Sequence, residues 1–248
     1  MAHALGHLIG CCRVGFGDPA LHAARHFGRF GAWLALAFAI LSPAFAQPAA
    51  PPPVRFAVFS PKPISNVVFT PRANAGPQKI ASYPTARSPR YEFRGAMPLK
   101  FTDATTGAVV AEAIIPPEMR DALLLFTAIE PVPATGLRYR VAVLDDGAAR
   151  QAAGALAIIN LSGLALSGTV NQENVTLKAG LNSPLAVGRS AKIILRTPVG
   201  EKSVQSYSDT VELKKNERAL LILFPPYYKG SLEVQARMLL DEPPTAAK

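Results

Sequence analysis

The chain has 248 residues, including 23 Pro, 18 Gly and only 2 Cys, and its formal net charge is +9. This length is enough for one large or two ordinary domains with an apolar core. All four His, both Cys and the only Trp lie within the first 33 residues. If that stretch is removed as a targeting segment, the remaining chain can form no disulfide, no Cys/His zinc site, no His-based catalytic triad and no redox thiol.

Residues 1–46 have the organisation of a secretory signal peptide, in which a basic flank precedes an uncharged apolar run over residues 32–41. Small residues one and three places before the cut define the predicted cleavage site, which consists of Ala44, Ala46 and Gln47. The apolar run is about half of the ~20 residues needed to span a bilayer. We therefore expect an exported protein, periplasmic, extracellular or at the cell surface, without a transmembrane span after processing. The alternative is an N-terminal membrane anchor or a buried helix. Residues 8–11 match a lipoprotein cleavage site, but they lack the basic flank and the apolar run that precede such a site.

The sequence after the signal is predicted to be all-β. Residues 47–53 are too rich in proline for a helix or central strand and are expected to form an extended tether. Apolar and polar residues alternate over residues 137–143 and 232–238, which indicates strands with one buried and one solvated face. Short apolar runs at residues 123–126 and 220–224 have the length of strands, and clusters of Pro, Gly, Asn and Asp separate such runs.

Four segments recur in the same order along the chain, at offsets of 96 to 102 residues. They pair residues 56–59 with 156–159, 87–94 with 189–196, 122–126 with 219–224, and 144–146 with 240–242. We interpret them as two tandem immunoglobulin-like β-sandwich domains, although the Cys and Trp of true immunoglobulin domains are missing. The predicted organisation is a signal peptide (1–46), a tether (47–53), a first sandwich (54–147), a linker (148–153), a second sandwich (154–242) and a tail (243–248).

The beginning of the second sandwich resembles the strand opening of exported bacterial β-sandwich repeats of unknown function. The resemblance is carried by Leu144-Asp145-Asp146, Gly154, the run Ile158-Ile159-Asn160-Leu161-Ser162-Gly163, and Gly180. In such repeats an Asn-aliphatic-Ser/Thr turn leads into a strand, and a later Gly bends the chain. The resemblance covers about the first half of the second sandwich. It implies an exported β-sandwich protein and supplies no catalytic residue.

Acidic residues recur at equivalent ends of the two predicted sandwiches, as Asp145, Asp146, Asp241 and Glu242. Catalytic carboxylates of glycosidases face each other at about 5–10 Å, and calcium takes at least about six oxygen ligands. We expect these acids to mark strand ends in separate domains. A calcium site and a carboxylate-based or Ser/Lys-based hydrolase are the less favoured alternatives. We therefore nominate no catalytic, cofactor-binding or metal-binding residue.

Positive charge is concentrated in residues 55–100, which hold eight bases and one acid, whereas residues 101–248 hold fifteen of each. Five bases are nominated as a surface for an anionic ligand: Arg72, Lys79, Arg87, Arg90 and Arg94. We expect Arg90 and Arg94 to stand beside Arg87 on the outer face of a strand, with Tyr91 and Phe93 on its buried face. The alternative is an ordinary solvated basic surface, because a similar pattern recurs over residues 189–196.

These observations favour an exported, non-enzymatic structural or binding protein of the bacterial cell envelope. Its expected partner is an anionic envelope polymer or another envelope protein. We expect no nucleic-acid partner, because the protein is predicted to be exported and has no recognised binding fold. The second hypothesis is a periplasmic assembly chaperone that binds its partners by strand addition. A hydrolase is the third.

Overall fold

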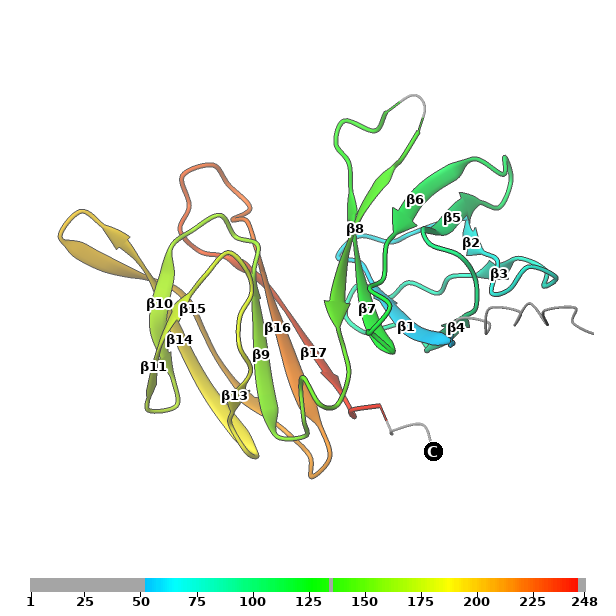
Figure 1. The fold of residues 1–248 in the computed structure, drawn as a ribbon. Coiled ribbons are helices and arrows are strands. Elements are labelled where there is room, and N and C mark those ends of the chain that lie inside the picture. The colour runs from blue at the N-terminus through cyan, green and yellow to red at the C-terminus, as the bar shows by residue number, and fades with distance from the viewer. Residues whose placement is uncertain (1–51, 134–135, 245–248) are drawn as a thin grey trace, which may run out of the picture. The chain divides into compact units, whose positions relative to one another are not determined.

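A computed structural model describes residues 52–133 and 136–244, and within these ranges the chain is all-β, as predicted (Figure 1). The signal peptide, its cleavage site at Ala44, Ala46 and Gln47, most of the tether and the end of the tail lie outside the described residues. No helix in the described part of the chain is long and apolar enough to cross a membrane.

The first strand set forms two four-stranded sheets, with the strand orders β4-β1-β7-β8 and β3-β2-β5-β6. Its strands are β1 (Val54–Phe59), β2 (Val67–Phe69), β3 (Gln78–Lys79), β4 (Tyr91–Phe93), β5 (Leu99–Asp103), β6 (Val109–Ala113), β7 (Asp121–Ala128) and β8 (Tyr139–Asp145). The β1–β7 pair is parallel, and the other pairs within these two sheets are antiparallel.

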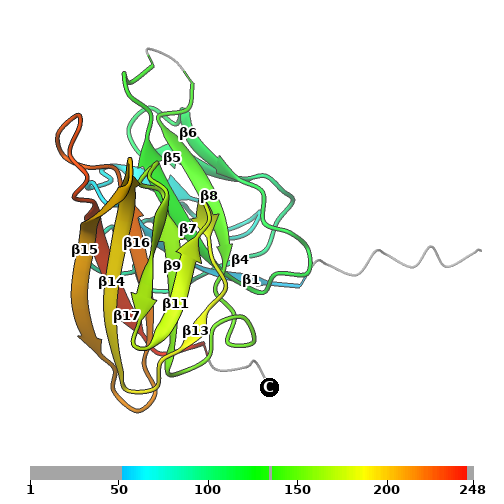
Figure 2. The ribbon, with the colours of Figure 1, turned by 90° about the vertical axis from the view of Figure 1, so that its left-hand side faces the viewer.

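The second strand set forms one sheet of order β12-β9-β16-β17, in which β13 also pairs with β9, and another of order β11-β10-β14-β15. Its strands are β9 (Ala155–Asn160), β10 (Leu166–Val170), β11 (Glu173–Leu177), β12 (Gly180–Leu181), β13 (Leu185–Ala186), β14 (Ser190–Val199), β15 (Lys202–Glu212), β16 (Arg218–Phe224) and β17 (Gln235–Asp241). β14 and β15 form a long hairpin, which Figure 2 shows at the edge of its sheet.

The first strand of each set lies parallel to the penultimate strand. Phe56 of β1 is opposite Ala122 of β7, and Leu156 of β9 is opposite Ala219 of β16. Three of the four recurring segments therefore lie in strands with corresponding neighbours. The fourth pair does not correspond, because residues 87–94 lead into β4, which pairs with β1, whereas residues 189–196 lie mostly in β14, which pairs with β10 and β15.

Each strand set encloses a hydrophobic core between its two sheets. Phe56 and Phe126 belong to the core of the first set, and Leu156 and Leu221 belong to that of the second. Alternation along β17 directs Ala236 and Met238 to the second core, and Val234, just before the strand, follows the same period of two, as predicted.

A third core joins the two strand sets, and it explains why four central strands contain runs of at least four consecutive apolar residues. Within β1, Phe56 and Val58 face the first core, whereas Ala57 and Phe59 face the third. β7, β9 and β16 divide their side chains between two cores in the same way. A strand buried on both faces needs a continuous run of apolar residues rather than an alternating pattern.

Candidate functional site

The five nominated bases lie in two kinds of environment. Arg72, Lys79 and Arg94 are exposed on the first strand set, whereas the side chains of Arg87 and Arg90 are only 6% and 28% exposed. The expectation that Arg87 stands at the solvated surface beside Arg90 and Arg94 is therefore wrong.

Hydrogen bonds to β1 hold residues 87–90 against the core. The Val58 N–H donates to Ser88 Oγ at 2.7 Å, and the Ser88 N–H donates to the Val58 carbonyl at 2.8 Å. Ser88 is itself buried. This anchoring directs the flanking guanidinium groups inward, toward carboxylates that are distant in the sequence.

Arg87 and Arg90 belong to a buried ionic cluster, whose other members are Arg218, Asp121, Asp146 and Asp241. Arg218 is fully buried, and its Nε and one Nη donate to the two carboxylate oxygens of Asp241 at 3.0 and 3.1 Å. Its other Nη donates to the backbone carbonyls of Asp146 and Gln151 at 3.0 and 3.1 Å. The Asp146 carboxylate, 3% exposed, accepts from Arg87 and also from Arg90 at 3.1 Å.

The ionic cluster brings together two acids that we expected at the ends of separate domains. Asp146 belongs to the connection after β8, and Asp241 ends β17, yet both carboxylates contact Arg218. Since guanidinium groups surround the buried Asp146 carboxylate, it has no access to a substrate. The cluster connects residues 87–90, the segment after β8, β16 and β17, and we assign it a structural role.

The basic excess of residues 55–100 is largely compensated by acids from elsewhere in the chain. Arg55 pairs with Asp121 at 2.8 Å and Lys62 pairs with Glu130 at 2.5 Å, in addition to the pairs that Arg87 and Arg90 make in the ionic cluster. Arg94 pairs locally with Glu92 at 2.7 Å. Three bases of the stretch make no ion pair with any described residue: Arg72, Lys79 and Lys100.

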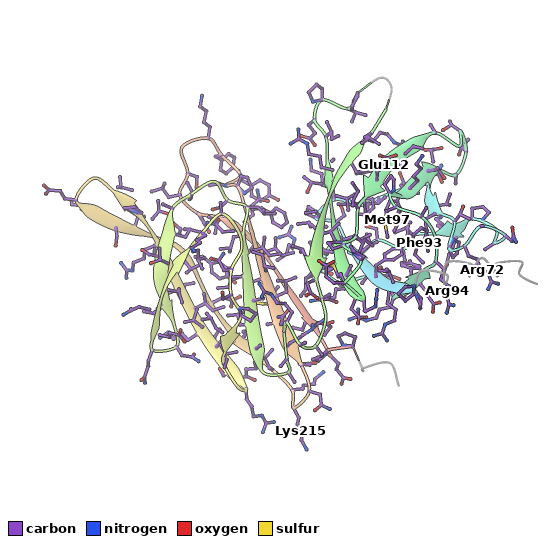
Figure 3. The ribbon with its side chains drawn as sticks, viewed as in Figure 1. Arg72, Phe93, Arg94, Met97, Glu112 and Lys215 are labelled. Carbon is purple, nitrogen blue, oxygen red and sulfur yellow. The ribbon has the colours of Figure 1, made fainter. Side chains whose placement is uncertain are left out.

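Two of these three bases surround a hollow together with Arg94. This basic hollow has a volume of about 570 Å³ and is lined by Arg72, Arg94, Lys100, Thr70, Thr102, Phe93 and Met97, among others. Arg72 and Arg94 form an isolated β-bridge, in which the Arg94 N–H donates to the Pro71 carbonyl at 2.8 Å. Figure 3 labels Arg72, Phe93, Arg94 and Met97 on this part of the first strand set. Lys79 is not among the lining residues.

Gly95 shapes the wall of the basic hollow. A Cβ atom at this position would lie 2.6 Å from Cζ of the Phe93 ring. The ring cannot easily move away, because Phe93 is 7% exposed and packs in the first core. A residue without a side chain is therefore needed where the chain turns over the ring.

The basic hollow carries three cations, and two carboxylates lie beside them: Glu92 pairs with Arg94, and Glu112 is opposite Lys100 in the β5–β6 register. Arg94 and Glu92 are both more than half exposed, so their pair contributes little to stability and is open to exchange with another anion. Arg72 and Lys100 are exposed and make no ion pair with any described residue. This arrangement suits reversible, salt-sensitive binding of an anion.

Asp103 fixes the end of β5, one residue beyond Thr102 of the basic hollow. Its carboxylate accepts the backbone N–H groups of Thr106 and Thr105 at 3.0 and 2.9 Å, and it pairs with Arg138 at 2.7 Å. These bonds stabilise the ionised form and hold the pKa of Asp103 below its ordinary value, and the backbone hydrogen bond from Thr106 has the largest effect.

The remaining lining residues could not be nominated from the sequence. Lys100 belongs to the basic stretch, but no local pattern indicates that it lies near Arg72. The two residues come together only through the pairing of β2 with β5, which are distant in the sequence. Nothing in the sequence distinguishes Phe93 or Met97 from ordinary core residues. A signal for the ionic cluster does exist, since a charged residue, Asp121 or Arg218, directly precedes each recurring apolar run.

Comparison with protein-family models and with curated proteins found no match to the chain. In the described ranges, no group of three or more His, Cys, Asp and Glu side chains is arranged to hold a metal ion. The resemblance to exported bacterial repeats stays a prediction.

Proposed function

We propose that the protein is an exported, non-enzymatic binding protein of the bacterial cell envelope that contacts an anionic polymer through the basic hollow. The observation that carries this proposal is the convergence of Arg72, Arg94 and Lys100 on one hollow, in which Arg72 and Lys100 make no ion pair with any described residue. The envelope location rests on the signal peptide expected over residues 1–46. In that compartment the available anionic partners are polysaccharides and phosphorylated polymers.

A polymer suits this site better than a small anion does. Contacts between exposed charges are worth only about 0–1 kcal/mol each, so one ligand group bound by three surface cations would be held weakly. A chain that presents charged groups repeatedly raises the effective concentration at the site and gains affinity without new contacts. The three cations of the basic hollow are exposed, so a polymer chain can reach all of them.

We further propose that residues 54–147 and 154–242 are tandem immunoglobulin-like β-sandwiches. The proposal is supported by the two cores, each packed between two sheets, and by the corresponding neighbours of β1 and β9. The likeness is one of architecture, because the first strand of an immunoglobulin constant domain pairs with the second. Here the first strand pairs with the penultimate strand instead.

The test compares two triple variants on a column of immobilised polygalacturonate, a carboxylate polysaccharide. Arg72, Arg94 and Lys100 are changed to Gln in the first variant, and Arg189, Lys192 and Arg196 in the control. The control residues are exposed cations of the second strand set without an ion pair to any described residue. Arg87 and Arg90 are left unchanged, because altering them would disturb the ionic cluster.

We expect the native protein and the control to be retained at low salt and released as exposed charges are screened, with a Debye length of about 10 Å at 0.1 M salt. The first variant should elute without retention and keep its melting temperature. Equal loss of retention in both variants, or full retention of both, would contradict the proposal.

A second candidate, a chaperone that binds by strand addition, is favoured by β15. This strand has 11 residues and, in the described part of the chain, forms a ladder only with β14. A Val234 N–H bond to the Ser206 carbonyl at 3.1 Å covers one point of its outer edge. A long open edge can pair with an extended segment of another protein. Recovery of one assembly subunit in a pull-down from envelope extract would favour this function over polymer binding.

A further inference from the structure

A second hollow, which shares no lining residue with the basic hollow, is lined by residues of both strand sets. Its volume is about 490 Å³, and its walls come from the ends of β1 and β7 and from the connection between β16 and β17. Its lining includes Pro61, Phe224, Pro225, Tyr227, Arg237 and the pair Lys62–Glu130. We call it the Arg237 hollow. Its volume lies within the range of about 300–1,000 Å³ that is typical of small-molecule sites.

The register of β17 places Arg237 at the margin of the third core. Arg237 lies opposite Ile222 of β16, and Leu239 lies two residues further along the same face. Both Ile222 and Leu239 belong to the third core. Residues that alternate along a strand or pair across strands share a face. The guanidinium of Arg237 therefore extends from the side of β17 that is turned toward apolar surroundings.

The charge of Arg237 is not compensated by any described carboxylate. Its only hydrogen bond, from Nη1 to the Ala236 carbonyl at 2.8 Å, leaves most of its five N–H groups without a partner in the described residues. The other two charges of the hollow neutralise each other, because Lys62 pairs with Glu130 at 2.5 Å. The Arg237 hollow thus presents one net positive charge.

Exposed aromatic rings stand at the rim of the Arg237 hollow. Tyr227 and Tyr228 are 76% and 79% exposed, and their ring centroids lie 6.3 Å apart. The base of this connection is held in place, because Gln235 Nε2 donates to the Pro225 carbonyl at 2.7 Å. Each tyrosine ring offers a ligand an apolar face together with a polar hydroxyl group.

We propose that the Arg237 hollow binds an amphiphilic monoanion, a small molecule with one carboxylate on an apolar ring or chain. The carboxylate accepts hydrogen bonds from Arg237 in the two-pronged geometry that guanidinium groups favour. The apolar body lies against Phe224 and Pro61, with Tyr227 covering it. This ligand differs from the polymer proposed for the basic hollow. The basic hollow has three cations and suits a polymer that carries many negative charges.

The test measures binding of 4-phenylbutyrate to the full protein by isothermal titration calorimetry, with the neutral 4-phenylbutanamide as the matched probe. We expect the carboxylate to bind at least about tenfold more tightly than the amide, since a hydrogen bond to a charged group is worth about that factor or more. Arg237→Gln should abolish this preference. Tyr227→Ala should weaken both probes.

Two control variants separate the site from general effects on charge and aromatic content. Arg189→Gln changes an exposed cation just before β14, and Tyr83→Ala removes a half-exposed ring; neither residue lines the Arg237 hollow, so both variants should leave binding unchanged. If Arg237→Gln does not fold, Tyr227→Ala still decides, because Tyr227 lies too far into solvent to affect folding. Equal affinity of the native protein for the two probes, or unchanged binding by Tyr227→Ala, would overturn the proposal.

Discussion

Replacing Arg218 with Met tests whether the ionic cluster holds the two strand sets together. The guanidinium of Arg218 donates to the Asp241 carboxylate and to the backbone carbonyls of Asp146 and Gln151 at 3.0–3.1 Å. Met has a similar length and fills the same space, so the variant removes the charge and the hydrogen bonds without creating a large cavity.

The magnitude follows from the groups that lose their donors. Breaking a buried ion pair by removing one partner costs about 3–5 kcal/mol. Asp146 keeps its contacts with Arg87 and Arg90, and Asp241 keeps Arg87 at 3.3 Å, so we expect the lower end of that range. A loss of about 3 kcal/mol corresponds to a decrease in melting temperature of roughly 6–12 °C for a chain of this size.

Equilibrium urea unfolding, followed by tyrosine fluorescence, measures the loss directly. The matched control is Arg140→Met, which makes the same substitution at an exposed site without an ion pair to any described residue. We expect that control to stay within about 0.5 kcal/mol of the native protein. A loss below about 1 kcal/mol in Arg218→Met would refute the reasoning, because it would mean that water already replaces these bonds in solution.

Two further predictions concern the third core and the acid side of the stability profile. Leu123→Asp should destabilise the protein as strongly as Leu124→Asp, by about 3 kcal/mol or more, because Leu123 faces the third core and Leu124 faces the first. A Leu123→Asp variant that melts like the native protein would show that the third core is absent in solution. The pKa of Asp103 is lowered on folding, so its contribution to stability is present at neutral pH and is lost as the pH falls below about 4. Melting temperatures measured between pH 6 and pH 3 should therefore fall less steeply in Asp103→Asn, and parallel profiles would contradict this.

The period-two patterns and the turn-forming clusters were sufficient to predict the all-β class, because alternation along a strand is a local property of the backbone. The recurring apolar runs also identified strands with corresponding neighbours, such as β7 and β16. The same runs also indicate burial on both faces of the strand, a feature that we did not predict. Runs such as residues 123–126 lack a polar alternate, which is the pattern of a strand buried on both faces.

The environment of each charge depended instead on contacts between distant segments. Arg87 and Arg90 have the same local pattern as Arg94, yet their partner Asp146 is more than fifty residues away and Arg94 remains exposed. The basic hollow likewise depends on the β-bridge between Arg72 and Arg94, and no periodic pattern in the sequence predicts this bridge. Net charge along a sequence adds up neighbours in the chain, whereas an electrostatic environment depends on neighbours in space. For this reason the excess of bases in residues 55–100 was visible in the sequence, but which of them remain free to bind a ligand was settled only when the strands packed.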